Sequence, residues 1–313
     1  MTKTRNRISL VVNICNEAST LAKCLSSAKD LADETIVIDM ESTDNGVEIA
    51  RRYGAQIFPH RPTKVVEESR NFAISKCTSD WVLILDPDEY ISAGLKKELR
   101  KLSLRHNINF VKIPRKNIIF GKWLRHSQYW PDYLIRFFRP KKVKWLSTVH
   151  SQPITEGHGH TLPDNPEFAI RHNNYQSINQ FLSKAIRYAE SKADELDSQN
   201  YKLRLSDLLI RPVQEFNSRF YAGQEYRDGF HGLIISILQS ISILLIYLFL
   251  WDRQRNQDKT LSKESYVSSV SQATFEFNHW HTKFLIEEHT HNLIVKLFYK
   301  LRYHLDRLTR KIQ

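Results

Sequence analysis

Two carboxylates one residue apart follow a short apolar run in the first third of the chain. The run 83–85 leads into Asp86-Pro87-Asp88-Glu89, and such a run is typical of a buried strand. Carboxylate oxygens are the ligands that Mg²⁺ and Mn²⁺ prefer, and both cations also bind diphosphate oxygens. The spacing predicts a site for Mg²⁺ or Mn²⁺ on Asp86 and Asp88. An acidic surface turn has the same pattern, so the motif alone leaves both interpretations open.

The elements around this motif alternate between short β-rich runs and helical patterns. Such alternation predicts an α/β fold with a mainly parallel mixed sheet and right-handed crossovers. Ligands of these sheets bind at the carboxyl ends of strands, where Asn16, Asp39 and Asp86 are expected. We expect strands at 8–14, 35–40, 55–58, 81–86 and 109–113, and helices at 18–31, 47–53, 67–77 and 92–104.

Four segments divide the chain at this level. Residues 1–115 carry the alternating pattern, and 116–227 contain irregular loops followed by helices. An apolar helix is expected in 228–252 and a basic helical tail in 253–313. Within these segments, helical patterns cover 178–198, 203–210 (ending before Pro212) and 293–312.

The apolar run 232–251 is twenty residues long, which is enough to span a bilayer. Basic residues flank it on both sides, so the positive-inside rule gives no orientation, and four of its residues are polar. We therefore expect a helix that lies in the membrane interface. A single membrane span and a buried core helix are the alternatives.

Charge is concentrated in one part of the sequence. The net charge is +12, and residues 101–150 hold twelve Lys and Arg but a single acid, Asp132. Such a block suits a phosphorylated partner or anionic headgroups, although a solvated basic face is also possible. The three cysteines form no C-x-x-C pair, which fits a reducing compartment and no disulfide framework.

Several segments resemble motifs of glycosyltransferase family 2, in the family's order and spacing. They are the opening strand Val11–Glu17, the "V-V-D-x-x-S-T-D"-like turn Ile36–Asn45, the "R-N-x-A"-like Ser69–Ala73, and Asp80–Glu89. The branch that adds sugars to lipopolysaccharide core is similar in three further places. These are Gly121–His126, Pro131–Arg139 and Asp228–Leu233.

The resemblance covers about residues 8–252 and implies a fold of the glycosyltransferase A type, which binds a nucleotide-sugar. Asp86 and Asp88 would hold the metal and the diphosphate, and Glu89 would orient its neighbours. Turn or capping roles are alternatives for Asp39, Asp44 and Glu17, and a surface ion pair is the alternative for Arg70. By the same resemblance the residues that bind the donor are Asn16, Glu17, Asp39, Asp44, Arg70 and Asp86.

The resemblance also implies inversion at the anomeric carbon, which needs a base for the acceptor hydroxyl. Our candidate is Asp132; an ion pair with Arg136 or Arg139 is its alternative role. His126 and His150 are alternative bases, and the family's glutamate after "V-H" is replaced here by Ser151. The residues Trp123, Trp130 and Trp145 could stack on sugars or lie among headgroups, or else pack in the core.

These features predict a metal-dependent inverting hexosyl- or heptosyltransferase. Its donor would be a nucleotide-sugar, most simply a UDP-sugar, and its acceptor a membrane glycolipid such as lipopolysaccharide core. The enzyme would act at the cytoplasmic face of the membrane, peripherally or anchored by one helix. The alternatives are a polyprenyl-phosphate acceptor, or a non-catalytic basic module that binds membranes or nucleic acid. Recognition strands typical of nucleic-acid binders are lacking in the sequence, so no nucleic acid is expected.

Overall fold

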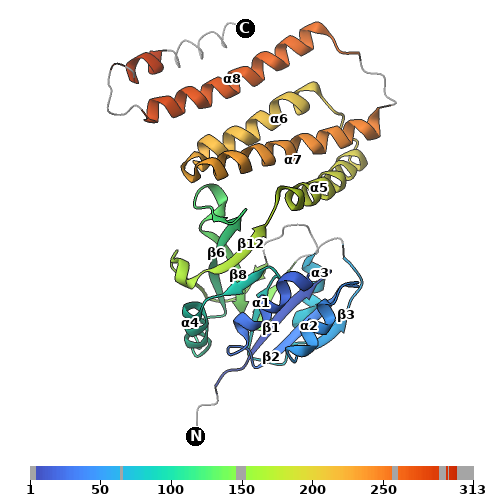
Figure 1. Cartoon of the computed structure of the whole chain (residues 1–313), viewed down its shortest axis with the longest axis vertical. Coiled ribbons are helices and arrows are strands. Elements are labelled where there is room, and N and C mark those ends of the chain that lie inside the picture. Colours follow the sequence, from blue (N-terminus) through green and yellow to red (C-terminus); the bar gives the residue numbers. More distant parts are fainter. Residues whose placement is uncertain are drawn as a thin grey trace. The chain divides into compact units, whose positions relative to one another are not determined.

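The chain forms two compact units in the computed structural model (Figure 1). The first contains residues 1–123 and 129–174, and the second contains 124–128 and 175–313. The structure describes residues 5–63, 66–145, 153–255, 260–288, 294 and 296–301.

The first unit is built on a ten-stranded mixed sheet in the order β3-β2-β1-β4-β8-β6-β12-β5, with β7 and β11 paired to β6. Strands β3, β2, β1 and β4 are parallel neighbours, and β8 runs antiparallel to β4 and β6. The predicted α/β class with a mainly parallel mixed sheet is confirmed. The strands are β1 (Ile8–Ile14), β2 (Glu34–Asp39), β3 (Gln56–Pro59), β4 (Trp81–Leu85), β5 (Glu89–Ile91), β6 (Phe110–Ile119), β7 (Lys122–Trp123), β8 (Asp132–Phe138), β11 (Gly159–Thr161) and β12 (Ile170–Tyr175); β9 (Val143–Lys144) and β10 (Ile154–Thr155) form a separate pair.

Helices cover both faces of this sheet, as the buried sequence of β1 requires. Leu10 and Val12 pack into one core with α1 and α4, whereas Val11 packs into a second core with α3. The hydroxyl of Ser92 accepts a hydrogen bond from the N–H of Leu95 and caps α4, as expected. The helices of this unit are α1 (Ala18–Ala28), α2 (Gly46–Arg52), α3 (Val66–Ser75) and α4 (Ala93–Ser103).

The second unit is helical. Helix α7 packs against α5 and α6, and α8 packs against α6, an arrangement that Figure 1 shows as neighbouring coils. The predicted helix 178–198 is found with the same bounds. The helices are α5 (Ile178–Ser198), α6 (Leu205–Asn217), α7 (Phe230–Gln254) and α8 (Lys263–Glu288).

The prediction that a helix ends before Pro212 is wrong, because α6 continues through Pro212 to Asn217. A proline inside a helix costs about 3 kcal/mol, and the packing of α6 between α7 and α8 offsets that cost. The carbonyl of Pro212 accepts a hydrogen bond from Ser240 of α7 at 2.8 Å, and a π-helix follows at Ser218–Ala222. Of the predicted helix 293–312, residues 294 and 296–301 are described and are helical, and its other residues lie outside the described part of the chain.

The segment Asp228–Leu233 has a structural role within the second unit. Gly229 has a φ of +67°, and a Cβ on Gly232 would lie 1.8 Å from the carbonyl oxygen of Glu225. The carboxylate of Asp228 accepts hydrogen bonds from the backbone N–H groups of Arg125 and His126 at 3.0–3.1 Å. The two glycines therefore allow a close approach that fixes the start of α7 and the segment 124–128.

Candidate functional site

The carboxyl ends of three neighbouring parallel strands lie at one edge of the sheet. Ile14 of β1 is in register with Asp39, the last residue of β2, and Val12 is in register with Leu85 of β4. Asp39 is itself one of these positions, Asp86 follows Leu85, and Asn16 lies two residues after Ile14. The structure thus brings together at one edge the residues that the sequence placed at strand ends.

The turn after β2 is held by several of the residues predicted to bind the donor. Asn16, with a φ of +60°, accepts hydrogen bonds at its Oδ1 from the N–H groups of Thr43 and Asp44. Asp44 accepts from Gly46 N–H in an Asx turn and from Ala18 N–H at the start of α1. These hydrogen bonds determine the shape of the turn at the edge of the site. They also use Oδ1 of Asn16 and both carboxylate oxygens of Asp44, which were predicted to bind the donor.

Asp39 and Glu17 lie beside this turn. Oδ1 of Asp39 accepts a hydrogen bond from the N–H of Ser42 at 3.0 Å, so this carboxylate fixes the turn while lying at the strand end. The backbone carbonyl of Glu17 accepts the first hydrogen bonds of α1 from Thr20 and Leu21. Both residues remain at the rim where a base or ribose was predicted to bind.

Two arginines hold the first carboxylate of the D-x-D motif. Nη2 of Arg70 lies 2.9 Å from Oδ1 of Asp86, and Nη2 of Arg136 lies 2.5 Å from Oδ2. Burial opposes the ionisation of Asp86, but the charges of Arg136, Arg70 and Arg115 outweigh it and hold the pKa of Asp86 well below its usual range. Asp86 is therefore an anion whose two oxygens are both bound by guanidinium groups.

Glu89 lies beneath this arrangement and is completely buried. Its Oε1 lies 3.1 Å from Arg115 and 3.3 Å from Arg136, and its Oε2 accepts from the N–H of Asp86 at 3.0 Å. Burial lowers the pKa of Arg136, but Asp86 and Glu89 reverse that effect and raise it. Glu89 thus contacts Arg115, Arg136 and the backbone of Asp86 and holds them in place. Arg115 and Arg136 belong to the basic block 101–150, so part of that block balances the charge of Asp86 and Glu89.

The same two arginines keep unused donors. Nε of Arg70 and Nε of Arg136 are buried and have no hydrogen-bond partner among the described residues. A buried N–H without a partner is costly, and an anionic ligand would satisfy it. The geometry suits the oxygens of a diphosphate, which guanidinium groups bind well.

The second carboxylate of the motif has a different partner. Oδ2 of Asp88 lies 3.4 Å from Nε2 of His172, which is buried on β12 in register with Glu89 of β5. Carboxylate and imidazole are both metal ligands, so this pair fits one divalent cation better than Asp86 does. Within the described residues, no cluster of three or more His, Cys, Asp or Glu side chains is arranged to hold a metal.

Asp132 begins β8 opposite Arg115 of β6. Its Oδ2 lies 2.7 Å from Nη2 and 2.8 Å from Nε of Arg115, and accepts from Nδ2 of Asn117 at 3.1 Å. The alternative role of Asp132 was an ion pair with Arg136 or Arg139, and the structure shows an ion pair with Arg115 instead. Cross-strand register explains the choice, because Arg115 and Asp132 are directly opposite one another.

The remaining aromatic and histidine candidates fall in different places. Trp145 is buried and packs against Phe138, which is its predicted core alternative. Trp123 and Trp130 meet edge to face, with centroids 5.1 Å apart. His126 belongs to the second unit, where its Nδ1 lies 3.2 Å from Oδ2 of Asp228. His150 and Ser151 lie outside the described residues.

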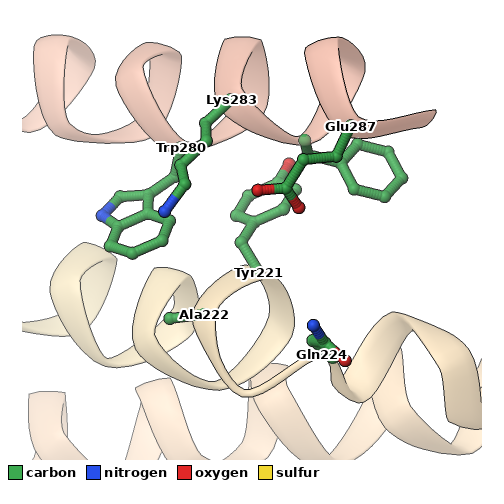
Figure 2. A pocket seen from close by; sticks show the side chains of 7 residues that line it. Tyr221, Ala222, Gln224, Trp280, Lys283 and Glu287 are labelled. Carbon is green, nitrogen blue, oxygen red and sulfur yellow. The ribbon is translucent and has the colours of Figure 1, made fainter. Parts of the chain in front are cut away.

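A small hollow of about 110 Å³ lies in the second unit (Figure 2). Aromatic side chains from α8 and from the π-helix face it, with Lys283 and Glu287 at its rim. None of the predicted donor, metal or catalytic residues lines it. Its lining residues are Tyr221, Ala222, Gln224, Trp280, Lys283, Phe284 and Glu287.

One segment of the chain, which has known relatives, contains most of the residues described above. They are Arg70 and Arg136, Asp86 and Asp88, and the turn after β2. Residues 9–156 match the family described as Glycosyl transferase family 2. These residues form a family 2 glycosyltransferase domain. The chain is accordingly an enzyme, a glycosyltransferase. His172 lies beyond the matched residues, so none of the family motifs noted in the sequence pointed to it.

The similarity to known glycosyltransferases extends over most of the chain. An uncharacterised glycosyltransferase of Rickettsia prowazekii (strain Madrid E) is 26% identical over 274 residues, which are 84% of this chain and 92% of the relative. A second one, from Rickettsia felis, is 27% identical over 282 residues, 86% of this chain and 96% of the relative. Among solved structures, the chain is similar to glucosyl-3-phosphoglycerate synthase from Mycobacterium tuberculosis, in complex with Mn²⁺, UDP and glucosyl-3-phosphoglycerate. The TM-score is 0.31 and the identity is 23%, and the match covers 38% of this chain and 46% of that chain.

Sequence reasoning missed three residues of the site: Arg115, Asn117 and His172. All three lie on β6 and β12, in the stretch where the sequence showed no clean period. The one signal in the sequence for His172 was its position two residues after Ile170 in a short β-rich run. Residues two apart in a strand point to the same face of the sheet.

Proposed function

We propose that this glycosyltransferase moves a hexose or heptose from a UDP-sugar to a membrane glycolipid such as lipopolysaccharide core, with inversion and with a divalent cation. The observation that carries the proposal is the pairing of two kinds of group at one sheet edge. Arginines with unused donors flank Asp86, and the potential metal ligands Asp88 and His172 lie beside it.

The donor's diphosphate would bind next to Arg70 and Arg136. Asp86 keeps both guanidinium groups in place, and their buried Nε–H groups would donate to phosphate oxygens. Because Asp86 and Glu89 both pair with Arg136 and raise its pKa, the arginine stays charged and can bind an anion. The nucleoside would lie toward the turn of Asn16, Glu17, Asp39 and Asp44.

Asp88 and His172 are the residues that would hold the cation. Two protein ligands are typical of a cation that arrives with nucleotide phosphates, and a nitrogen ligand favours Mn²⁺ over Mg²⁺. When bound, the cation would act as a Lewis acid that neutralises charge on the leaving nucleoside diphosphate. This assignment replaces the shared Asp86–Asp88 site, because both oxygens of Asp86 are bound by arginines.

Asp132 remains our candidate for the catalytic base. Its Oδ2 is committed to Arg115 and Asn117, so Oδ1 is the atom that would accept the proton of the acceptor hydroxyl. Arg115 fixes the orientation of the carboxylate. A base that is held in place can contribute about 10²–10⁴-fold to the rate.

Helix α7 supports a peripheral position at the cytoplasmic face of the membrane. By length and composition it could cross a membrane. However, it packs against the charged helix α5, where Arg253 pairs with Asp194 and Gln254 donates to Asp197. Charged side chains are costly inside a bilayer, so a helix that lies in the interface fits better than a span.

The lipid-facing part of α7 would be a stripe of exposed apolar side chains. Phe230, Ile237, Ile241 and Leu248 are each at least 38% exposed and recur at helical spacing on one face. Eighteen residues separate the first from the last, which corresponds to about 27 Å of helix. This stripe has the length and polarity of an interfacial membrane helix.

The test is a panel of nucleotide-sugars with the full-length enzyme, with and without Mn²⁺. The proposal expects hydrolysis or transfer of one UDP-sugar that requires Mn²⁺, with membrane glycolipid extract as the acceptor. Activity that is unchanged in excess chelator would rule out the metal, and activity with a lipid-free acceptor alone would rule out the glycolipid.

A further inference from the structure

A chain of hydrogen bonds connects Asp132 to the imidazole beside Asp88. Nδ2 of Asn117 donates to the carbonyl of Tyr129 at 3.0 Å and to Oδ2 of Asp132 at 3.1 Å. Both partners are acceptors, so the orientation of the Asn117 amide is determined by its contacts. Oδ1 of Asn117 must therefore be the atom that points toward His172.

That orientation determines which nitrogen of His172 carries a proton. Nδ1 of His172 lies 2.7 Å from Oδ1 of Asn117, and an amide oxygen can only accept. Nδ1 must therefore carry the hydrogen, and Nε2 is left facing Oδ2 of Asp88 at 3.4 Å. In a neutral imidazole, Nε2 then presents its lone pair toward the carboxylate.

A lone pair and a carboxylate oxygen this close repel one another unless a proton on Nε2 or a metal cation lies between them. Asn117 is 2% exposed and His172 is 7% exposed, so water screens this repulsion only weakly. Of the other groups in the cluster, Arg115 forms ion pairs with both Asp132 and Glu89.

We propose that Asn117 is a positioning residue which holds His172 as the Nδ1–H tautomer and so prepares Nε2, together with Asp88, to bind a divalent cation. This inference rests on the metal site of the proposed function and assigns a role to a residue that has no contact with the cation. Partners of this kind typically change metal affinity by about 10- to 100-fold.

The first experiment measures the tautomer in the unmodified, metal-free protein. NMR with ¹⁵N-labelled histidine reports which ring nitrogen is protonated, and the His172 signal is identified by its loss in His172→Gln. We expect a proton on Nδ1. A neutral ring protonated on Nε2 overturns the proposal.

The second experiment measures Mn²⁺ affinity by calorimetry in the presence of UDP. Asn117→Leu should weaken Mn²⁺ binding by about 10- to 100-fold, with mixed tautomers at His172. Asn217→Leu is the matched control, because Asn217 is also buried but its amide has no partner among the described residues; its Mn²⁺ affinity should be unchanged.

The outcomes separate this inference from the proposed function. If the unmodified protein binds no Mn²⁺ with UDP, the metal-dependent function fails, while the tautomer measurement still tests Asn117. If the unmodified protein and Asn117→Leu bind Mn²⁺ equally well, the metal site stands and the role of Asn117 is overturned.

Discussion

Nη2 of Arg136 lies 2.5 Å from Oδ2 of Asp86, the residue that follows the last residue of β4. The same nitrogen lies 3.3 Å from the buried Glu89. A motif that the sequence presents as a bare pair of carboxylates is thus part of a network in which arginines balance the acids. In the proposed function this network would bind the diphosphate as well as the cation.

Arg70 tests the anion-binding half of this site. Arg70→Gln should weaken UDP binding by roughly 10-fold or more, because a charge-assisted hydrogen bond contributes about 1.5–3 kcal/mol and 1.4 kcal/mol corresponds to a factor of ten. Calorimetric titration with UDP measures the effect. Arg52→Ala, which removes an exposed charge from α2, is the control and should bind UDP normally. Equal affinities in the two variants would place the diphosphate elsewhere.

Asp132 tests the assignment of the base. Asp132→Asn should lower kcat by about 10²–10⁴-fold and leave UDP affinity unchanged, since the side chain keeps its shape but cannot take a proton. Steady-state kinetics and a UDP titration together check this. Asp164→Asn, at an exposed position, should leave both unchanged. A kcat near that of the unmodified enzyme would transfer the role to another residue.

The stripe on α7 predicts binding to lipid. Ile237→Glu should reduce cosedimentation with vesicles of phosphatidylglycerol and phosphatidylethanolamine by roughly tenfold or more, because burying an isoleucine contributes about 1.5–3 kcal/mol. Ile186→Glu is a matched control on α5, since both isoleucines are 40% exposed. If the two variants lose binding equally, the surface of α7 has no special role.

Glu225 predicts a pH dependence of stability in the second unit. It is completely buried, and burial raises the pKa of its carboxyl even though Ser236 and Arg219 act in the opposite direction. A raised folded-state pKa favours folding at low pH, and that advantage is lost as the pH rises through the folded-state value. Glu225→Gln should therefore be more stable than the unmodified protein at pH 8, with the difference shrinking below pH 5.

Denaturant unfolding of both proteins from pH 4 to pH 8 measures that difference. Other titrating groups cancel because they are common to both chains. A difference in the free energy of unfolding that stays constant with pH would show that Glu225 does not titrate differently in the folded state.

The sequence predicted the first half of the fold well because its signals are local. The buried strand β4 is a continuous apolar run and β1 is mostly apolar, and Ser92 marks the start of α4, so these elements need no distant information. The strand ends then placed Asn16, Asp39 and Asp86 at one edge by topology alone. The helix end predicted before Pro212 is wrong because the packing of α6 outweighs a strong local signal.

The rest of the site depends on long-range pairing that no local pattern records. His172 reaches Asp88 only because β12 pairs with β5, and Arg115 meets Asp132 only because β6 and β8 pair in that register. The alternative ion pair considered for Asp132 therefore named Arg136 or Arg139, whereas its partner is Arg115. Asn117 gave no signal in the sequence, since its role lies entirely in its three contacts.

The most direct test of the account is a crystal soaked with MnCl₂ and UDP, with diffraction recorded at an energy where manganese scatters anomalously. The account predicts an anomalous peak bound by Oδ2 of Asp88 and Nε2 of His172, with the diphosphate next to Arg70 and Arg136. Bound UDP with no manganese between Asp88 and His172, or manganese held by Asp86 instead, would contradict it.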